Sequence, residues 1–142
     1  MQTFTFIFLA FLLASTLVQL WLSLRQKQHV SHHRSAVPEA FSGKITLDEH
    51  QKAADYTLAK GGFGRIELML GFVVLLAWTL GGGLEWLDQL WRSVGWGPLL
   101  TGTAVILSMA LISGLIDLPA SLYRTFVMEE KFGFNKATKK IF

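Results

Sequence analysis

Three long apolar blocks dominate the sequence, at residues 4–24, 68–84 and 99–116, and none of them contains a charged residue. At 1.5 Å of rise per residue, helices over these blocks measure roughly 32, 25 and 27 Å, against a bilayer hydrocarbon core of about 30 Å. The blocks are apolar all round, whereas the strands of a membrane barrel alternate between apolar and polar positions. The pattern predicts an all-α integral membrane protein with transmembrane helices over residues 4–24, 68–84 and 99–118.

The composition argues against a small soluble fold. Of the 142 residues, 51% are hydrophobic, and the mean hydropathy is +0.42. A soluble chain of this length has too few polar neighbours to cover three such helices. The sequence has no cysteine, which excludes disulfides and thiolate metal sites but says little about the compartment.

The connection between the first two blocks carries helix signals of its own. Thr46 stands three residues before Glu49, which forms a capping box in which each side chain satisfies a free backbone N–H of the other residue. Gly61 and Gly62 then provide a stop signal. We predict a short cytoplasmic amphipathic helix over residues 47–60, and whether it does more than connect two spans stays open.

Basic residues are unevenly divided among the connections. Lys and Arg number seven between the first and second blocks, one (Arg92) between the second and third, and five after the third. Because cytoplasmic connections are enriched in Lys and Arg, the first connection and the tail are predicted to be cytoplasmic. The amino terminus and residues 85–98 are then outside or lumenal, in a multi-pass protein of a bacterial inner membrane or the endoplasmic reticulum.

The same charge pattern bears on partners. The basic residues flank the apolar blocks and do not form an Arg/Lys run interleaved with aromatic residues, so nucleic acid is not an expected partner. The expected partner is the lipid bilayer. Trp86, Trp91 and Trp96 lie between the second and third blocks, and indole rings favour the headgroup region. We interpret all three as membrane anchors.

One ionisable residue lies at the edge of a block. Asp117 follows the third block, and an ionisable residue within a span is a functional candidate because its burial in lipid is costly. If this helix continues through Leu122 and Tyr123, Asp117 lies near the cytoplasmic interface, with Arg124 two turns away. Two interpretations of Asp117 and Arg124 stay open: a structural polar contact, or the lining of a water-filled chamber.

The histidines do not match a zinc motif. His29, His32 and His33 lie in what reads as a juxtamembrane loop with no further ligand nearby, and His50 has no second histidine at the H-E-x-x-H spacing. Neither G-x-S-x-G nor a P-loop occurs. The sequence therefore predicts no catalytic residue, no metal ligand and no cofactor in this chain.

Three stretches carry a more specific signal. They are residues 37–57, Lys60 with residues 63–65, and a stretch that begins at Leu118-Pro119 and ends in a charged aromatic block. That block is difficult to attribute to general membrane composition, and it consists of Glu129, Glu130, Lys131, Phe132, Gly133, Phe134 and Asn135. Together the stretches resemble the amino-terminal membrane domain of the CAAX prenyl protease type 1 family of zinc metallopeptidases, over essentially the whole chain.

The resemblance implies a multi-helix membrane protease that encloses a large hydrated chamber. The family's zinc ligands are the two histidines of H-E-x-x-H and a downstream glutamate, and the glutamate of that motif activates a zinc-bound water. None of these has a counterpart in the 142 residues. Zinc, a peptide or prenylated protein substrate, and contacts with a downstream catalytic region are therefore expected only of the full-length family member, after a fourth helix beyond residue 142.

Two functions stay open at this stage. In the first, residues 1–142 are the N-terminal transmembrane portion of a membrane-embedded zinc metalloendopeptidase, without the catalytic domain, and form part of the chamber wall. In the second, they are a non-catalytic three-helix membrane scaffold or interaction protein. Either way the chain is expected to be inactive alone, so its standing as an enzyme is left undecided.

Overall fold

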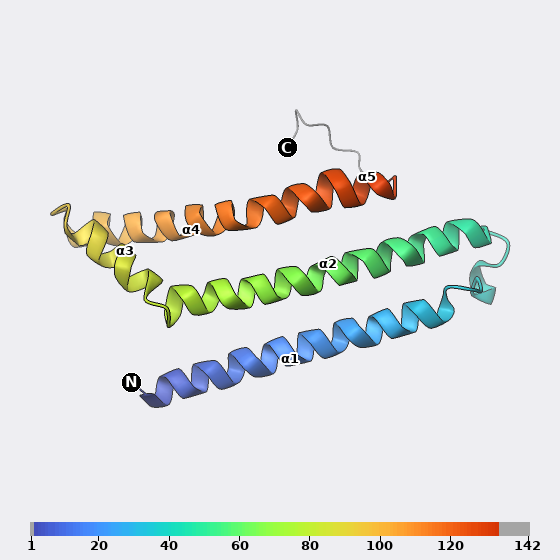
Figure 1. Cartoon of the computed structure of the whole chain (residues 1–142), viewed down its shortest axis with the longest axis horizontal. Helices are drawn as coiled ribbons and strands as arrows, with labels where there is room; N and C mark the ends of the chain where they lie inside the picture. The colour runs from blue at the N-terminus through green and yellow to red at the C-terminus, as the bar shows by residue number, and fades with distance from the viewer. Residues whose placement is uncertain (1, 134–142) are drawn as a thin grey trace.

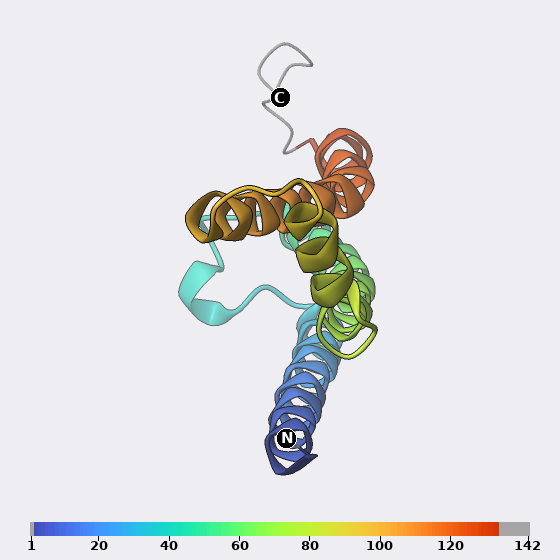
Figure 2. The ribbon, with the colours of Figure 1, turned by 90° about the vertical axis from the view of Figure 1, so that its left-hand side faces the viewer.

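The computed structural model describes residues 2–133, and it contains three long helices. They are α1 (Gln2–His33), α2 (Leu47–Thr79) and α4 (Pro98–Tyr123). In Figure 1 they run antiparallel in chain order, with α2 between α1 and α4. Figure 2 shows from one end that they form an open row and do not close into a bundle.

Short elements connect and extend these helices. The 3-10 turn η1 (Glu39–Phe41) lies between α1 and α2, and α3 (Gly83–Arg92) lies between α2 and α4. The π-helical segment η2 (Arg124–Met128) and the single turn α5 (Glu129–Lys131) continue α4 without a break. No strand occurs in residues 2–133, so the all-α prediction is confirmed.

Three helical stretches are long and apolar enough to cross a membrane: Gln2–His33, Leu47–Thr79 and Pro98–Lys131. The prediction of three candidate membrane-spanning helices is thus confirmed, although the helices extend beyond the apolar blocks. The first continues from the end of its block at Leu24 to His33. His29, His32 and His33 therefore lie on a helix, and the prediction of a juxtamembrane loop for them is wrong.

The start of α2 follows the predicted capping box. The Thr46 hydroxyl accepts the Glu49 backbone N–H at 3.3 Å, and the Glu49 carboxylate accepts the Thr46 backbone N–H at 2.8 Å. The predicted stop at Gly61 and Gly62 is wrong, because α2 continues through both glycines to Thr79. Residues 47–60 are therefore the first part of a long helix and not a separate amphipathic helix.

Contacts with both neighbouring helices explain why the glycines do not end α2. Each glycine in a helix interior costs about 0.5–1 kcal/mol relative to alanine. Directly after them, the Phe63 ring packs against Tyr123 of α4, with ring centroids 5.2 Å apart. Arg65 donates a hydrogen bond to the Ser23 hydroxyl of α1 at 3.2 Å. Packing against α1 and α4 thus outweighs the tendency of the two glycines to end the helix.

The other end of α2 is set by a run of three glycines. The helix ends at Thr79, five residues before the predicted end at residue 84. Gly82 adopts a φ of +78°, which glycine tolerates best. A Cβ on Gly83 would lie 2.7 Å from the ring of Trp78, so the chain reverses here only because side chains are absent.

The connection to α4 contains a helix that the sequence did not predict. Residues 83–92 form α3, and α4 then begins at Pro98, a position where the missing backbone N–H costs nothing. The expected continuation of the third span through Leu122 and Tyr123 is confirmed, and α4 accommodates Pro119 in its interior.

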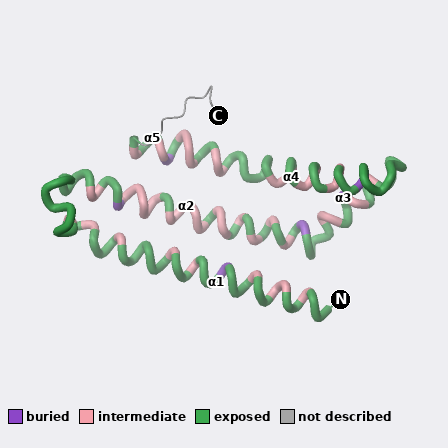
Figure 3. Tube along the Cα trace, turned by 180° about the vertical axis from the view of Figure 1, so that it is seen from behind, coloured by how far each residue is buried: buried purple, intermediate pink, exposed green. Residues whose placement is uncertain are grey.

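Very little of the molecule is buried. Figure 3 shows exposed and intermediate residues along all three long helices. Within residues 2–133, the buried apolar residues are Ala54, Trp78, Leu87 and Met128. Large apolar side chains remain exposed near the start of α1, as in Phe4 (76% exposed), and near the start of α4, as in Leu99 (83% exposed). A row of helices with apolar surfaces on this scale is suited to lipid and to further helices, and not to water.

Candidate functional site

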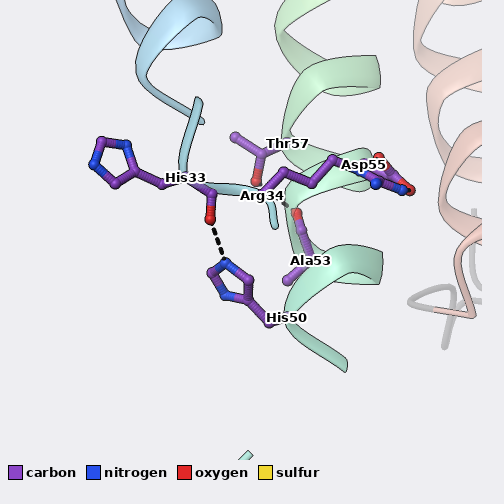
Figure 4. Close-up of polar contacts among 6 residues, drawn as sticks. All are labelled: His33, Arg34, His50, Ala53, Asp55 and Thr57. Atoms are coloured by element: carbon purple, nitrogen blue, oxygen red, sulfur yellow. Dashed lines mark hydrogen bonds and ion pairs between the residues drawn. The ribbon is translucent and has the colours of Figure 1, made fainter. Parts of the chain in front are cut away.

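Three of the four histidines, His29, His32 and His33, lie in the last turns of α1, and His50 lies in the first turn of α2. Figure 4 shows His33 and His50 at this junction. The His50 Nε2–H donates a hydrogen bond to the backbone carbonyl of His33 at 2.9 Å. The His33 Nδ1–H in turn donates to the backbone carbonyl of His29 at 2.9 Å, and these two rings lie 4.3 Å apart. The His50 hydrogen bond thus joins α2 to α1, whereas the His33 hydrogen bond lies within α1.

This cluster does not fit a catalytic zinc ion. Such a site needs three protein ligands and an open position for water. Within residues 2–133, no group of three or more His, Cys, Asp or Glu side chains is placed to hold a metal ion. The zinc that the resemblance implies therefore has no site among these residues.

A bidentate ion pair lies beside the histidines. Arg34 donates from Nε and from its terminal NH₂ to the two carboxylate oxygens of Asp55, at 2.6 and 2.7 Å (Figure 4). Asp55 lies in the charged first part of α2, outside the apolar stretch that begins at Leu68. The hydrogen bonds from Arg34 hold the pKa of this carboxyl below its ordinary value of 3.8, against a smaller opposing effect of desolvation.

A second ion pair joins α2 to the end of α4. Arg124 donates to the Glu67 carboxylate at 3.3 Å, and both side chains are partly exposed. They line an open pocket of about 420 Å³, together with Gln26, Tyr56, Thr57, Lys60, Gly61 and Gly64. The pocket lies along α2 between Tyr56 and Glu67. We call the end of the molecule where α1 ends and α2 begins the charged end.

The structure separates the two predicted polar candidates. Asp117 is exposed on α4 and forms no hydrogen bond or ion pair with any residue between 2 and 133. Arg124 contacts Glu67 and not Asp117. The sequence analysis missed Glu67, although a signal was present: it is the last charged residue before the block at 68–84, where a carboxylate needs a partner.

The charged aromatic block is only partly described. Glu129, Glu130 and Lys131 form α5, and Gly133 adopts a φ of +74°, which fits a tight turn. The Phe132 ring meets the edge of Tyr56 in α2, with centroids 5.5 Å apart. Phe134 and Asn135 lie outside the described residues. The first part of the block therefore packs against the charged first part of α2.

The π-helical segment η2 explains how the block reaches α2. Residues 124–128 widen the helix by one residue per turn, and such segments are frequent at functional sites. Arg124 opens this segment and pairs with Glu67, while Met128 closes it and is buried. Nothing in the hydrophobic pattern signalled it.

A sequence profile described as CAAX prenyl protease N-terminal, five membrane helices, matches residues 26–142. The chain belongs to this family. The resemblance noted in the sequence is confirmed, and the chain is an integral membrane protein. The description counts five membrane helices; the matched residues include the candidates Leu47–Thr79 and Pro98–Lys131 and only the end of α1.

Curated relatives agree over nearly the whole chain. The CAAX prenyl protease 1 homolog of Mus musculus is 34% identical over 153 residues, which cover 96% of this chain and 30% of the mouse protein. The homolog of Homo sapiens is 35% identical, and the alignment again covers 96% of this chain and 30% of the relative. The probable CAAX prenyl protease 1 of Schizosaccharomyces pombe is 33% identical over 134 residues, covering 85% of this chain and 28% of that protein.

The chain thus spans less than a third of the length of these relatives. It corresponds to the N-terminal membrane domain of the family, and the family's metalloprotease part is not in these 142 residues.

Proposed function

We propose that this chain forms part of the wall of a hydrated chamber within a membrane-embedded zinc metalloendopeptidase. The zinc ligands and the general base then come from a downstream catalytic region of the same protein. The observation that carries the proposal is the match to the family's N-terminal membrane domain over residues 26–142. The alignment with the mouse relative covers 96% of this chain but only 30% of the mouse protein. This supports a membrane domain that is followed by a separate catalytic region.

The open row of helices supports a role within a larger assembly. Helix association in lipid depends on close packing and on polar contacts, because apolar side chains gain little by leaving lipid for one another. The described helices bury only a few residues among themselves, and the family description names five membrane helices, more than residues 2–133 contain. Further helices of the same protein are the natural partners of this row.

Asp117 supports a hydrated chamber. It lies seven residues before Arg124, which places it about 10 Å further along the helix from the charged end. A carboxylate facing hydrocarbon at such a depth is costly. Since it is exposed and has no partner among residues 2–133, water or a polar group from the rest of the protein is the environment that would relieve this cost.

Topology and substrate belong to the same proposal. The charged end faces the cytoplasm and the α3 end faces outside or the lumen, in a bacterial inner membrane or the endoplasmic reticulum. The basic residues support this orientation, since Arg92 is the one Lys or Arg outside the cytoplasmic segments. The substrate is a peptide or a prenylated protein, and the second agrees with the relatives, which are named CAAX prenyl proteases.

The first test is the gene sequence beyond codon 142. Continuation into an H-E-x-x-H motif supports the protease, whereas a native stop codon supports the non-catalytic scaffold. The second test uses the complete protein. Cleavage of a prenylated peptide that a zinc chelator abolishes is the expected result, and a complete protein with the motif but without chelator-sensitive cleavage would contradict the proposal.

The chamber wall is tested separately in the same protein. Because the described chain has no cysteine, Asp117→Cys introduces one defined thiol into this domain. It should react with a hydrophilic thiol reagent, while Leu115→Cys, two positions earlier on another side of α4, should not. Equal reactivity at the two positions would argue against a water-filled wall at Asp117.

A further inference from the structure

The helix α3 presents one side to the rest of the protein. Leu87 is its most buried residue, at 2% exposure, and Trp91 lies on the same side one turn later. The Trp91 indole N–H donates a hydrogen bond to the Ser108 hydroxyl of α4 at 3.0 Å. The Trp91 ring also stacks on Trp96, with centroids 5.4 Å apart. These contacts fix α3 against the start of α4.

The apolar surface of α3 is wider than this contact. Successive residues of an α-helix are rotated by about 100°, so Trp86 and Leu90 lie next to each other and extend the apolar side beyond Leu87. Trp86 is 60% exposed and Leu90 is 47% exposed. Neither is needed for the attachment to α4, and both present apolar surface away from the protein.

The polar side of α3 satisfies itself within the helix. Gln89 donates to the Glu85 carboxylate at 2.8 Å, and Arg92 donates to the Asp88 carboxylate at 2.6 Å. Because these side chains bond to each other, the polar side of α3 needs no further hydrogen-bond partner from the protein. The helix thus divides into a protein side, an exposed apolar side and a solvated polar side.

The place of α3 in the fold identifies what covers the exposed apolar side. It connects the end of α2 to the start of α4 and runs obliquely across that end of the row (Figure 1). The ends of membrane-spanning helices lie at the bilayer interface, where amphipathic helices rest with their apolar side in the boundary between headgroups and acyl chains.

We infer that α3 is an interfacial helix whose partner is the lipid surface, with Trp86 and Leu90 inserted at the boundary between headgroups and acyl chains. Glu85, Gln89 and Arg92 face the water. The inference divides the three tryptophans by role: Trp86 is the anchor, whereas Trp91 and Trp96 hold the connection together. It does not depend on the protease function, because it concerns how this domain sits in its bilayer.

The charge of α3 indicates that its binding does not depend on anionic lipid. Its four polar residues comprise two acidic side chains, one basic and one amide, so the helix has no excess of positive charge. Insertion of apolar side chains therefore holds it, without attraction to anionic headgroups. The depth of Trp86 and Leu90 should be the same in neutral vesicles and in vesicles that contain anionic lipid.

The experiment uses single cysteines, for which the absence of native cysteine makes this domain suitable. Trp86→Cys, Leu90→Cys and the matched control Gln89→Cys are each labelled with an environment-sensitive fluorophore. The protein, with any sequence that continues beyond residue 142, is reconstituted in phosphatidylcholine vesicles. Quenching is compared between iodide in the water and a lipid nitroxide placed high on the acyl chain. Circular dichroism checks that each variant retains its helix content.

The labels at positions 86 and 90 should be quenched by the lipid nitroxide at least about threefold more than the label at 89, with the reverse order for iodide. Because Leu90→Cys removes no tryptophan, it keeps the test valid if Trp86→Cys fails to fold. Equal iodide quenching at 86, 89 and 90 would place the apolar side in water and overturn the inference. Protection of 86 and 90 from both quenchers would assign the side to a protein partner and overturn it as well.

Discussion

Arg34 and Asp55 form a two-point ion pair that fastens the chain after α1 to the first turns of α2, with N–O distances of 2.6 and 2.7 Å. Both side chains are about 40% exposed, so water weakens the pair and its effect on stability is modest. Asp55→Asn should lower the thermal midpoint of unfolding in detergent slightly at about pH 7.

The pH dependence separates this ion pair from a packing effect. The pKa of Asp55 is lowered in the folded protein, so its stabilising contribution is present above the ordinary aspartate value of 3.8 and is lost as the pH falls through the folded value. The difference between wild type and Asp55→Asn should shrink as the pH falls below 3.8 and vanish once this carboxyl is protonated in the folded protein as well. The control is Asp48→Asn on the exposed start of α2. A difference that persists undiminished in acid would contradict the assignment.

Gly61 provides a test of the continuous α2. A Cβ built on Gly61 meets no atom within 4 Å, so alanine fits without a clash. Because α2 passes through this position as a regular helix, Gly61→Ala should raise the free energy of unfolding by about 0.5–1 kcal/mol. Gly83→Ala is the opposite control, since its Cβ would lie 2.7 Å from the Trp78 ring, and it should destabilise. Denaturation in detergent measures both, and destabilisation by Gly61→Ala would indicate a break at residue 61.

The features that were predicted correctly depend on residues that are close together in the sequence. Uninterrupted apolar blocks of 17 to 21 residues have few structures available other than a membrane-spanning helix. Thr46 and Glu49 form the predicted capping box because both partners lie within one helical turn. The family resemblance likewise depends on short runs of specific residues.

The errors arose where a distant contact overrides a local signal. Gly61 and Gly62 read as a stop, but Phe63 and Arg65 hold α2 against both neighbours. Glu67 and Arg124 are far apart in the sequence, and the π-helical segment that begins at Arg124 leaves no trace in the hydrophobic pattern. Spacing alone does not indicate which acid a given arginine will meet.

The charged aromatic block is expected to be an ordered junction at the charged end. Phe132 packs against Tyr56, and Gly133 turns the chain with a φ of +74°. Phe132→Ala should accelerate amide hydrogen exchange in residues 129–133, whereas Glu130→Gln, at an exposed position, should leave it unchanged. Gly133→Ala should cost about 1–2 kcal/mol, because alanine avoids this backbone conformation. Rapid exchange of the whole stretch in the unaltered protein would decide against an ordered junction.

The proposed orientation is open to a labelling test on intact cells. Ser42 follows η1 near the charged end and Ser93 follows α3 at the other end, and both are exposed. Twelve of the thirteen Lys and Arg residues lie in the segments assigned to the cytoplasm. Ser93→Cys should therefore react with an impermeant thiol reagent from outside, and Ser42→Cys should react only after permeabilisation. Reaction of both in intact cells would disprove the orientation.

The last prediction is that these 142 residues alone bind no catalytic zinc and cleave no peptide. A catalytic zinc needs three ligands in a preformed geometry, and metal-bound histidines use their second ring nitrogen to hold that geometry. In the described structure the His50 Nε2–H and the His33 Nδ1–H donate to backbone carbonyls, which leaves one nitrogen of each ring free. Within residues 2–133, however, no three His, Cys, Asp or Glu side chains are placed to hold a metal ion, so only weak, adventitious binding is expected.

The measurement is metal content after dialysis of the purified chain in detergent, followed by assays against a prenylated peptide and an unfolded membrane protein. A His50→Ala variant serves as the control for adventitious metal, since any trace zinc at the junction should decrease with it while activity stays absent in both. Each assay is repeated with the downstream region co-expressed. Activity that appears only on co-expression agrees with a chamber-wall role, because the ligands then come from the other part. Stoichiometric zinc or chelator-sensitive cleavage by the chain alone would mean that a metal site lies within these 142 residues, and the prediction would be wrong.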